Sequence, residues 1–153
     1  MFNKTHITLL FSGVLIDQIT KFLAQAYLSE LNSIDVIPGV LSFPLVHNYG
    51  AAYGILQDHR YFLLSVSLAV ILGAFWFRHD IAKTISSRWG LCFLMAGTLG
   101  NFVDRLYRGF VVDFIDIRIF PVFNLADVFI DMGLIFLVWS LFFSRERNHL
   151  SSF

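Results

Sequence analysis

The stretch YFLLSVSLAVILGAFWF, residues 61–77, contains no charged side chain. A helix of about 20 mostly apolar residues is long enough to cross a lipid bilayer. Three further apolar runs of this kind occur, at about residues 5–27, 89–106 and 123–143. The sequence therefore predicts an all-α polytopic membrane protein with four transmembrane helices in a single domain, residues 1–153.

The composition supports this reading. Of 153 residues, 57% are hydrophobic and only 14% are charged, whereas soluble domains carry roughly 25% charged residues. The mean hydropathy is +0.70, and a globule this small cannot hide so much apolar surface. Lys plus Arg equal Asp plus Glu at 11 each, so no basic field indicates a nucleic-acid partner. A single cysteine, Cys92, excludes an intramolecular disulfide.

The side of the membrane follows from Lys and Arg in the loops, because cytoplasmic loops carry the excess. Six lie on the side of the two termini and three on the other: Lys4, Arg78, Lys83, Arg88, Arg145 and Arg147 against Arg60, Arg108 and Arg118. We therefore expect cytoplasmic termini and external loops at about residues 28–60 and 107–122. The polar residues 17–21 favour a retained first span over a cleaved signal.

Residues 34–46 are rich in β-branched and aromatic residues, interrupted by Pro38, Gly39 and Pro44. This pattern is typical of short strands joined by turns. The first external loop should therefore contain a small extracytoplasmic β element.

Ionisable residues inside spans are costly and are functional candidates by default. At 1.5 Å per residue, Asp17 lies about 20 Å along the first helix, at the same depth as residues 101–105 and Asp127. Asp17 and Lys21 are one turn apart and should pair; a structural and a chemical role for this pair are equally compatible with the spacing. Around the second external loop, acids outnumber bases: Asp113, Asp116, Asp127 and Asp131 against Arg105, Arg108 and Arg118.

Two carboxylates at a partly desolvated site share a proton unevenly, so that one can act as acid and the other as base toward water. This is the chemistry of peptide hydrolysis. A metal-dependent hydrolase is the main alternative, because Asp113, Asp116 and Asp127 could hold a hard divalent cation. A small transport or scaffold protein with intramembrane ion pairs is the other. The histidines lack ligand spacing, and Ser12 lacks a recognisable base.

Five sequence blocks, in order, resemble the signature blocks of bacterial lipoprotein signal peptidases, also called signal peptidase II. They are Asp17-Gln-Ile-Thr-Lys21, Asn48-Tyr-Gly-Ala-Ala-Tyr-Gly54, Gly100-Asn-Phe-Val-Asp-Arg105, Val111-Val-Asp-Phe114 and Phe123-Asn-Leu-Ala-Asp127. The resemblance covers nearly the whole chain.

The resemblance implies an aspartic endopeptidase of the bacterial inner membrane, with its active site near the outer surface. Such an enzyme removes the signal peptide from diacylglyceryl-modified prolipoproteins, cutting just before the lipidated cysteine. Asp113 and Asp127 match the catalytic pair. The residues matching substrate-binding or supporting positions are Asn48, Gly50, Asn101, Asp104, Arg105, Asn124, Asp17 and Lys21. The expected partners are the lipidated substrates and membrane lipid; no cofactor and no metal is implied. Asp131 is outside the pattern, and an acid that either supports the site residues from behind or lines the cavity is the simplest expectation for it.

Overall fold

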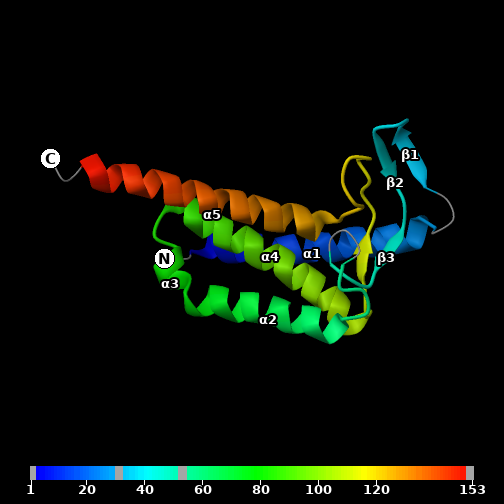
Figure 1. Ribbon diagram of the computed structural model, residues 1–153, viewed down its shortest axis with the longest axis horizontal. Helices are drawn as coiled ribbons and strands as arrows, with labels where there is room; N and C mark the ends of the chain where they lie inside the picture. The colour runs from blue at the N-terminus through cyan, green and yellow to red at the C-terminus, as the bar shows by residue number, and fades with distance from the viewer. Residues whose placement is uncertain (1–2, 30–32, 52–54, 151–153) are drawn as a thin grey trace.

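The computed structural model describes residues 3–29, 33–51 and 55–150, with side chains as far as residue 142. Its long helices run side by side, and its strands gather at one end of the bundle (Figure 1). The opposite end holds the start of α1, the short α3 and the end of α5. The elements are α1 (Lys4–Tyr27), β1 (Ile34–Ile37), β2 (Leu41–Phe43), β3 (Val46–Asn48), α2 (Arg60–Trp76), α3 (Arg78–Ile81), α4 (Ile85–Tyr107), β4 (Val111–Asp113) and α5 (Leu125–Leu150).

Each of the four predicted spans corresponds to one long helix, with bounds that differ at some ends. α4 begins at Ile85 rather than at 89, because Thr84 and Ser87 form a capping box that starts the helix in a polar turn. The fourth helix begins two residues later than predicted, since Asn124 caps it, and it continues past 143 to Leu150. An apolar run marks the part of a helix that suits lipid, whereas capping residues decide where the helix begins.

Length and apolar composition single out α1 and residues Leu125–Phe142 of α5 as helices that could cross a membrane, within the part of the chain that the structure describes. α2 is also apolar but is shorter, at 17 residues. α4 is less apolar because its buried face carries polar and small residues.

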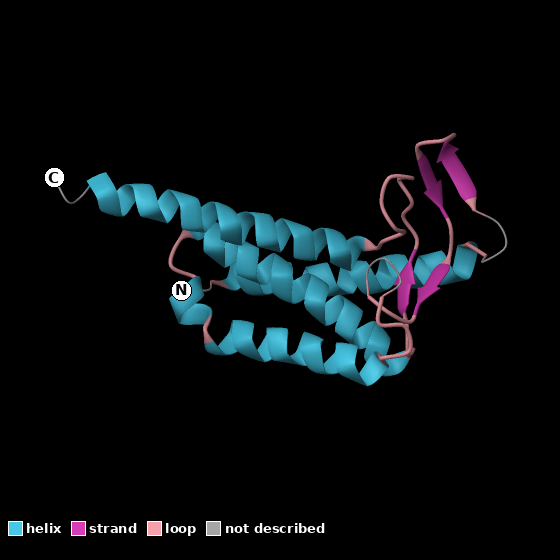
Figure 2. Ribbon diagram, in the orientation of Figure 1, coloured by secondary structure: helices cyan, strands magenta, loops and turns pink. Residues whose placement is uncertain are grey.

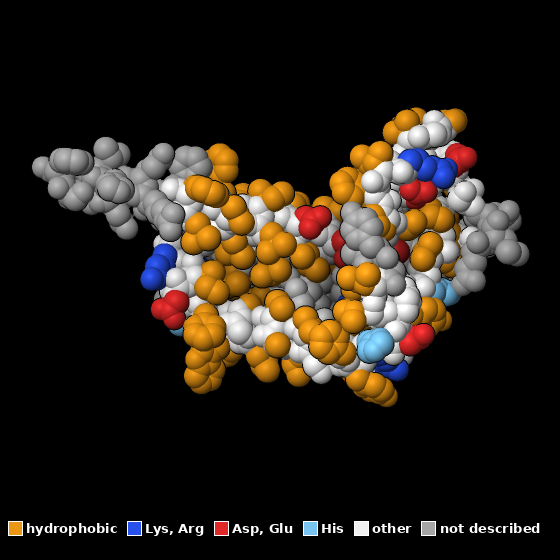
Figure 3. Space-filling view, in the orientation of Figure 1, with side chains coloured by type: hydrophobic (Ala, Val, Ile, Leu, Met, Phe, Trp, Pro, Cys, Tyr) orange, Lys and Arg blue, Asp and Glu red, His pale blue; other side chains and the backbone are white. Residues whose placement is uncertain are grey.

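The burial pattern is the reverse of that in a soluble protein. The fully buried side chains include Lys21, Asp17, Asp104 and Asn124, whereas large apolar side chains such as Phe11 remain exposed. Orange apolar side chains spread along the helices in Figure 3, while most charged groups lie near the two ends. Exposed apolar surface on this scale marks a face that meets lipid or a partner rather than water.

α4 occupies the centre of the bundle and packs against α1, α2 and α5. Small residues permit the close approach to α5: a Cβ at Gly90 would lie 2.9 Å from the carbonyl oxygen of Gly133. A Cβ at Gly97 would collide with the carbonyl oxygen of Ala126. The small residues on this face of α4 therefore serve close helix packing.

The strands form two separate antiparallel pairs (Figure 2). β1 pairs with β2 through a turn that places Gly39 at φ 76°, which confirms the β element predicted in residues 34–46. β3 pairs with β4, so that Val46 lies opposite Asp113 and Asn48 opposite Val111. The second pair was not predicted. It joins the two loops that were expected to be external and carries one of the candidate aspartates.

Gly100 provides a test of the approach of α1 to α4. A Cβ there would collide with Oδ2 of Asp17 and lie 3.2 Å from the Cβ of Ala126. Gly100→Ala should therefore destabilise the fold by about 1–3 kcal/mol and lower the Tm of the protein purified in detergent. Gly73→Ala is the matched control, because a Cβ at Gly73 meets nothing within 4 Å. A Gly100→Ala protein with the parent's Tm would contradict this packing.

Candidate active site

Asp113 and Asp127 face one cavity from different elements. Asp113 is the last residue of β4 and is only 2% exposed; Asp127 is half-buried in the first turn of α5. Both side chains line a cavity of about 890 Å³. Between the two aspartates the chain turns back on itself through the antiparallel bridge between Ile115 and Phe123.

Two asparagines hold the Asp113 carboxylate. Asn48 Nδ2 donates to its Oδ2 at 2.9 Å, and Asn124 Nδ2 donates to its Oδ1 at 2.6 Å. The amide orientations are fixed, because the backbone N–H of Gly50 donates to Asn48 Oδ1 and that of Asp127 donates to Asn124 Oδ1. A backbone N–H can only donate. Both NH₂ groups must therefore point at Asp113.

The Asp127 carboxylate is held in the same way. Asn101 Nδ2 donates to its Oδ1 at 2.8 Å, and the backbone N–H of Asn124 donates to its Oδ2 at 3.1 Å. Lys21 Nζ donates to Asn101 Oδ1 at 2.8 Å, which fixes the orientation of this third amide. Each oxygen of the two carboxylates thus accepts one N–H bond and keeps a lone pair for a proton or for water.

The environment of Asp113 favours its neutral form. Burial, followed by the negative charge of Asp127, raises the pKa of Asp113 to about 6, although the hydrogen bonds from Asn48 and Asn124 oppose the shift. A carboxyl group that keeps its proton up to about pH 6 can act as an acid. The two aspartates therefore have the unequal environments that acid and base catalysis require.

Lys21 is fully buried and is linked to Asp127 through Asn101. Its three N–H groups reach Asp17 Oδ2 at 2.9 Å, Asp104 Oδ2 at 2.9 Å and Asn101 Oδ1 at 2.8 Å. The predicted pairing of Asp17 with Lys21 is confirmed. Asp17 Oδ1 also accepts the backbone N–H of Ala126 at 2.9 Å, so the pair contacts the first turn of α5. A carboxylate at a helix N-terminus is favourable there.

Two members of this cluster were not predicted. Gln18 Nε2 donates to Asp104 Oδ1 at 3.1 Å, and Arg108 forms an ion pair with the same carboxylate. The backbone N–H of Val112 donates to the other oxygen, which attaches β4 to the cluster. The spacing of Asp104 and Arg108, one helical turn apart, was the signal that could have identified the second ion pair.

Arg105 lines the same cavity and donates from Nη2 to the carbonyl oxygen of Gly50 at 3.1 Å. A Cβ at Gly50 would lie 2.5 Å from the carbonyl oxygen of Ile55. This position therefore requires glycine if the loop is to present both its N–H to Asn48 and its oxygen to Arg105.

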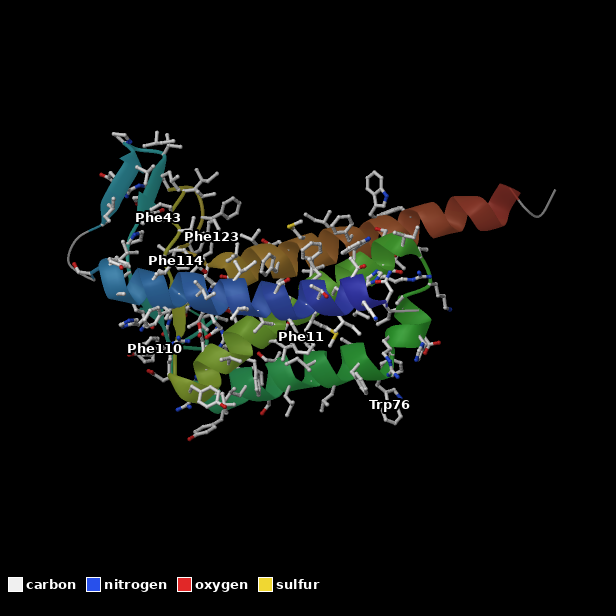
Figure 4. All side chains as sticks on the ribbon, turned by 180° about the vertical axis from the view of Figure 1, so that it is seen from behind. Phe11, Phe43, Trp76, Phe110, Phe114 and Phe123 are labelled. Carbon is white, nitrogen blue, oxygen red and sulfur yellow. The ribbon has the colours of Figure 1, made fainter. Side chains whose placement is uncertain are left out.

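The cavity has a polar end and an apolar end. Beyond the aspartates its wall follows one face of α5, through Val128, Met132 and Ile135, and is completed by the segment 120–123. The surface is hollowed between the strands and α5 in Figure 3, with apolar side chains around the hollow. Figure 4 shows Phe43, Phe114 and Phe123 at the end of the bundle that carries the strands. The shape suits a ligand with an apolar portion and a polar group to be held at the aspartates.

The remaining two acids, Asp116 and Asp131, lie in different surroundings. Asp116 does not line the cavity; its carboxylate bonds to Ser42 and pairs with Arg118. Within the described ranges, no group of three or more His, Cys, Asp or Glu side chains could hold a metal ion. The alternative site with three aspartates around one cation is therefore wrong, because Asp116 points elsewhere. Asp131 lines the cavity, as expected.

Comparisons with known proteins agree with this architecture. The family described as Signal peptidase (SPase) II matches residues 9–143. The chain is 36% identical to the lipoprotein signal peptidase of Acinetobacter baumannii, over 92% of this chain and 84% of that protein. It is 39% identical to the one from Microcystis aeruginosa, over 88% and 90%.

A solved structure described as a bacterial membrane enzyme, obtained by the in meso method at 2.3 Å, superposes with a TM-score of 0.89. It is 32% identical and covers 95% of this chain, which covers 92% of it in turn. A second, at 1.9 Å, gives a TM-score of 0.83 at 34% identity, with coverages of 92% and 94%. The family match and the named relatives together establish that this chain belongs to the signal peptidase II family of membrane peptidases.

Proposed function

We propose that this protein is an aspartic endopeptidase that removes the signal peptide from diacylglyceryl-modified prolipoproteins. The cut falls just before the lipidated cysteine. The observation that carries the proposal is the pair formed by Asp113 and Asp127, which line one cavity and are each held by two N–H donors. The family supports a peptidase that acts on prolipoproteins.

The chemistry follows from unequal carboxyl groups. One carboxylate takes a proton from water as the water oxygen attacks the scissile carbonyl carbon, and the other carboxyl group donates its proton to the carbonyl oxygen. The C–N bond then breaks, and a proton passes to the departing nitrogen. Asn48, Asn101 and Asn124 orient the pair so that both groups keep a lone pair toward the cavity.

The substrate-binding roles are assigned by position. Arg105 lies in the cavity wall with the pair and bonds to the carbonyl oxygen of Gly50. These two residues hold the substrate backbone near the scissile bond. The buried cluster of Asp17, Lys21 and Asp104 supports the site, because Lys21 donates to Asn101, which donates to Asp127. The apolar stretch along α5 receives the apolar parts of the substrate, and membrane lipid surrounds the exposed faces of the helices.

The membrane arrangement is part of the proposal. α1, α2, α4 and α5 each span the bacterial inner membrane within one domain, residues 1–153, and both termini lie in the cytoplasm. The start of α1 and the end of α5 lie at the end of the bundle away from the strands (Figure 1), which supports an even number of crossings. The active site then lies near the outer surface, where a lipidated cysteine meets the bilayer interface.

Replacing either aspartate by asparagine tests the mechanism. Asparagine keeps the size of the side chain but cannot accept a proton from water, so Asp113→Asn or Asp127→Asn should lower kcat by a factor of about 10² or more. Uncleaved diacylglyceryl-prolipoprotein should accumulate, with near-normal amounts of enzyme in the membrane. Immunoblots of substrate and enzyme, with a purified assay, measure both quantities.

Asp116→Asn is the matched control, because Asp116 lies near the same loop but bonds to Ser42 and Arg118 rather than lining the cavity. It should cleave at close to the parent rate, and Asp131→Asn should be far milder than either dyad variant. Parent activity should also survive strong chelators. An Asp113→Asn enzyme that cleaves as fast as the parent would refute the aspartic mechanism.

Single cysteines test the topology, introduced into a protein with Cys92 replaced by Ala. A membrane-impermeant thiol reagent added outside the cell should label a cysteine at Ile119, which is exposed in the second external loop. A cysteine at Lys83, between α3 and α4, should react only after the membrane is opened. Labelling of the Lys83 position from outside would contradict cytoplasmic termini.

A further inference from the structure

Asp127 is connected to a buried cation by two hydrogen bonds. Lys21 Nζ donates to Asn101 Oδ1 at 2.8 Å, and Asn101 Nδ2 donates to Asp127 Oδ1 at 2.8 Å. A cation at the oxygen of an amide polarises the amide, so its N–H becomes a stronger donor. Asp127 also sits at the third position of α5, where backbone N–H groups favour a negative charge.

The connection of Asp113 to Lys21 is weaker: Asn124 Nδ2, which donates to Asp113, also donates at 3.3 Å to Asn101 Oδ1, the atom that accepts from Lys21. The amides that donate to it, from Asn48 and Asn124, have their oxygens held by the neutral backbone N–H groups of Gly50 and Asp127. Its side chain is 2% exposed, whereas that of Asp127 is half-buried. Asp113 is thus the more deeply buried carboxyl group, whereas Asp127 is the one that lies at a helix N-terminus and is linked to a cation through a single amide.

We propose that Lys21, acting through Asn101, is a positioning residue that makes Asp127 the base and leaves Asp113 as the acid. This inference rests on the proposed function. Asp127 takes one proton from water as the water oxygen bonds to the carbonyl carbon, and Asp113 gives its proton to the carbonyl oxygen. In the second step Asp127 returns its proton to the departing nitrogen as the C–N bond breaks. Asp113 recovers a proton from the hydroxyl, so the dyad ends as it began.

The effect of Lys21 has to be local, because its cluster is neutral. Lys21 and Arg108 carry two positive charges, and Asp17 and Asp104 carry two negative ones. Their combined field at a distance is small, so the hydrogen bond through Asn101 is the route by which Lys21 acts on Asp127. Arg108 belongs to the same cluster, but its described hydrogen bonds go to Asp104 and Gln18 rather than to an amide that donates to the dyad.

Other charged or titratable groups also face the aspartates. Arg105 lines the cavity from α4, His47 from β3 and Asp131 from α5. They remain in place in the variants compared below. Any difference in pH dependence between those variants therefore comes from the buried cluster around Lys21 rather than from these neighbours.

The pH dependence of kcat/KM separates the two roles, since its acidic limb reports the base of the free enzyme and its alkaline limb the acid. Lys21→Met should move the acidic limb to higher pH by about 0.5–1 unit, a loss of about three- to tenfold on that limb. The alkaline limb, which reports Asp113, should move less, because burial and the charge of Asp127 act more strongly on Asp113 than Lys21 does. Arg108→Met, which removes the same charge from the same cluster, should leave the acidic limb where it is. Coincident acidic limbs for parent and Lys21→Met, or an equal shift in Arg108→Met, would overturn the proposal.

A substrate-free measurement separates this inference from the proposed function. Infrared spectroscopy with isotope-labelled aspartate follows carboxyl protonation in the purified protein, whether or not it cleaves anything. The carboxyl titration that is missing from Asp127→Asn belongs to Asp127. Its midpoint should shift upward in Lys21→Met and not in Arg108→Met. Identical titrations in the parent and in Lys21→Met would overturn the inference. If Lys21→Met fails to accumulate, Asp17→Asn with Lys21→Met removes a balanced pair of charges, and the same shift is expected.

Discussion

The ammonium group of Lys21 has to find three acceptors, because it is fully buried inside a helix bundle whose outer surface is apolar. An unpaired charge in such a place is strongly unfavourable. The three acceptors come from Asp17 on α1 and from Asp104 and Asn101 on α4. The carboxylates then bind the backbone of Ala126 at the start of α5 and of Val112 in β4. Those two segments carry the candidate catalytic aspartates, so one buried charge determines how both are placed.

The same constraint explains why the interior is made of small and polar residues. The helices have to approach closely for short side chains such as Asp17 and Asn101 to reach across them, and glycine at 97 and 100 in α4 removes the Cβ atoms that would prevent it. Large apolar side chains are left for the outer faces of the helices (Figure 3). The bundle gains its specificity from polar contacts inside and its compatibility with lipid from apolar contacts outside.

Some of this could be predicted from the sequence, and the limit has a physical reason. Apolar runs identified the four long helices, and the spacing of Asp17 and Lys21 identified their ion pair, because both signals are local. The pairing of β3 with β4 and the contact of Asn48 with Asp113 depend on two loops meeting in space, which no local pattern records. Two of the three acceptors of Lys21, Asp104 and Asn101, likewise come from another helix. The resemblance to a family identified the aspartates, but the orientation of the three amides required the structure.

The proposed reaction is cleavage of a lipidated precursor by the aspartate pair, immediately before the modified cysteine. Mass spectrometry of the products tests this proposal, with the purified protein given the same precursor with and without the diacylglyceryl group. One cut is expected in the lipidated precursor, immediately before the modified cysteine, and the unmodified precursor should stay intact. Cleavage at another bond, or equal cleavage of the two precursors, would contradict it.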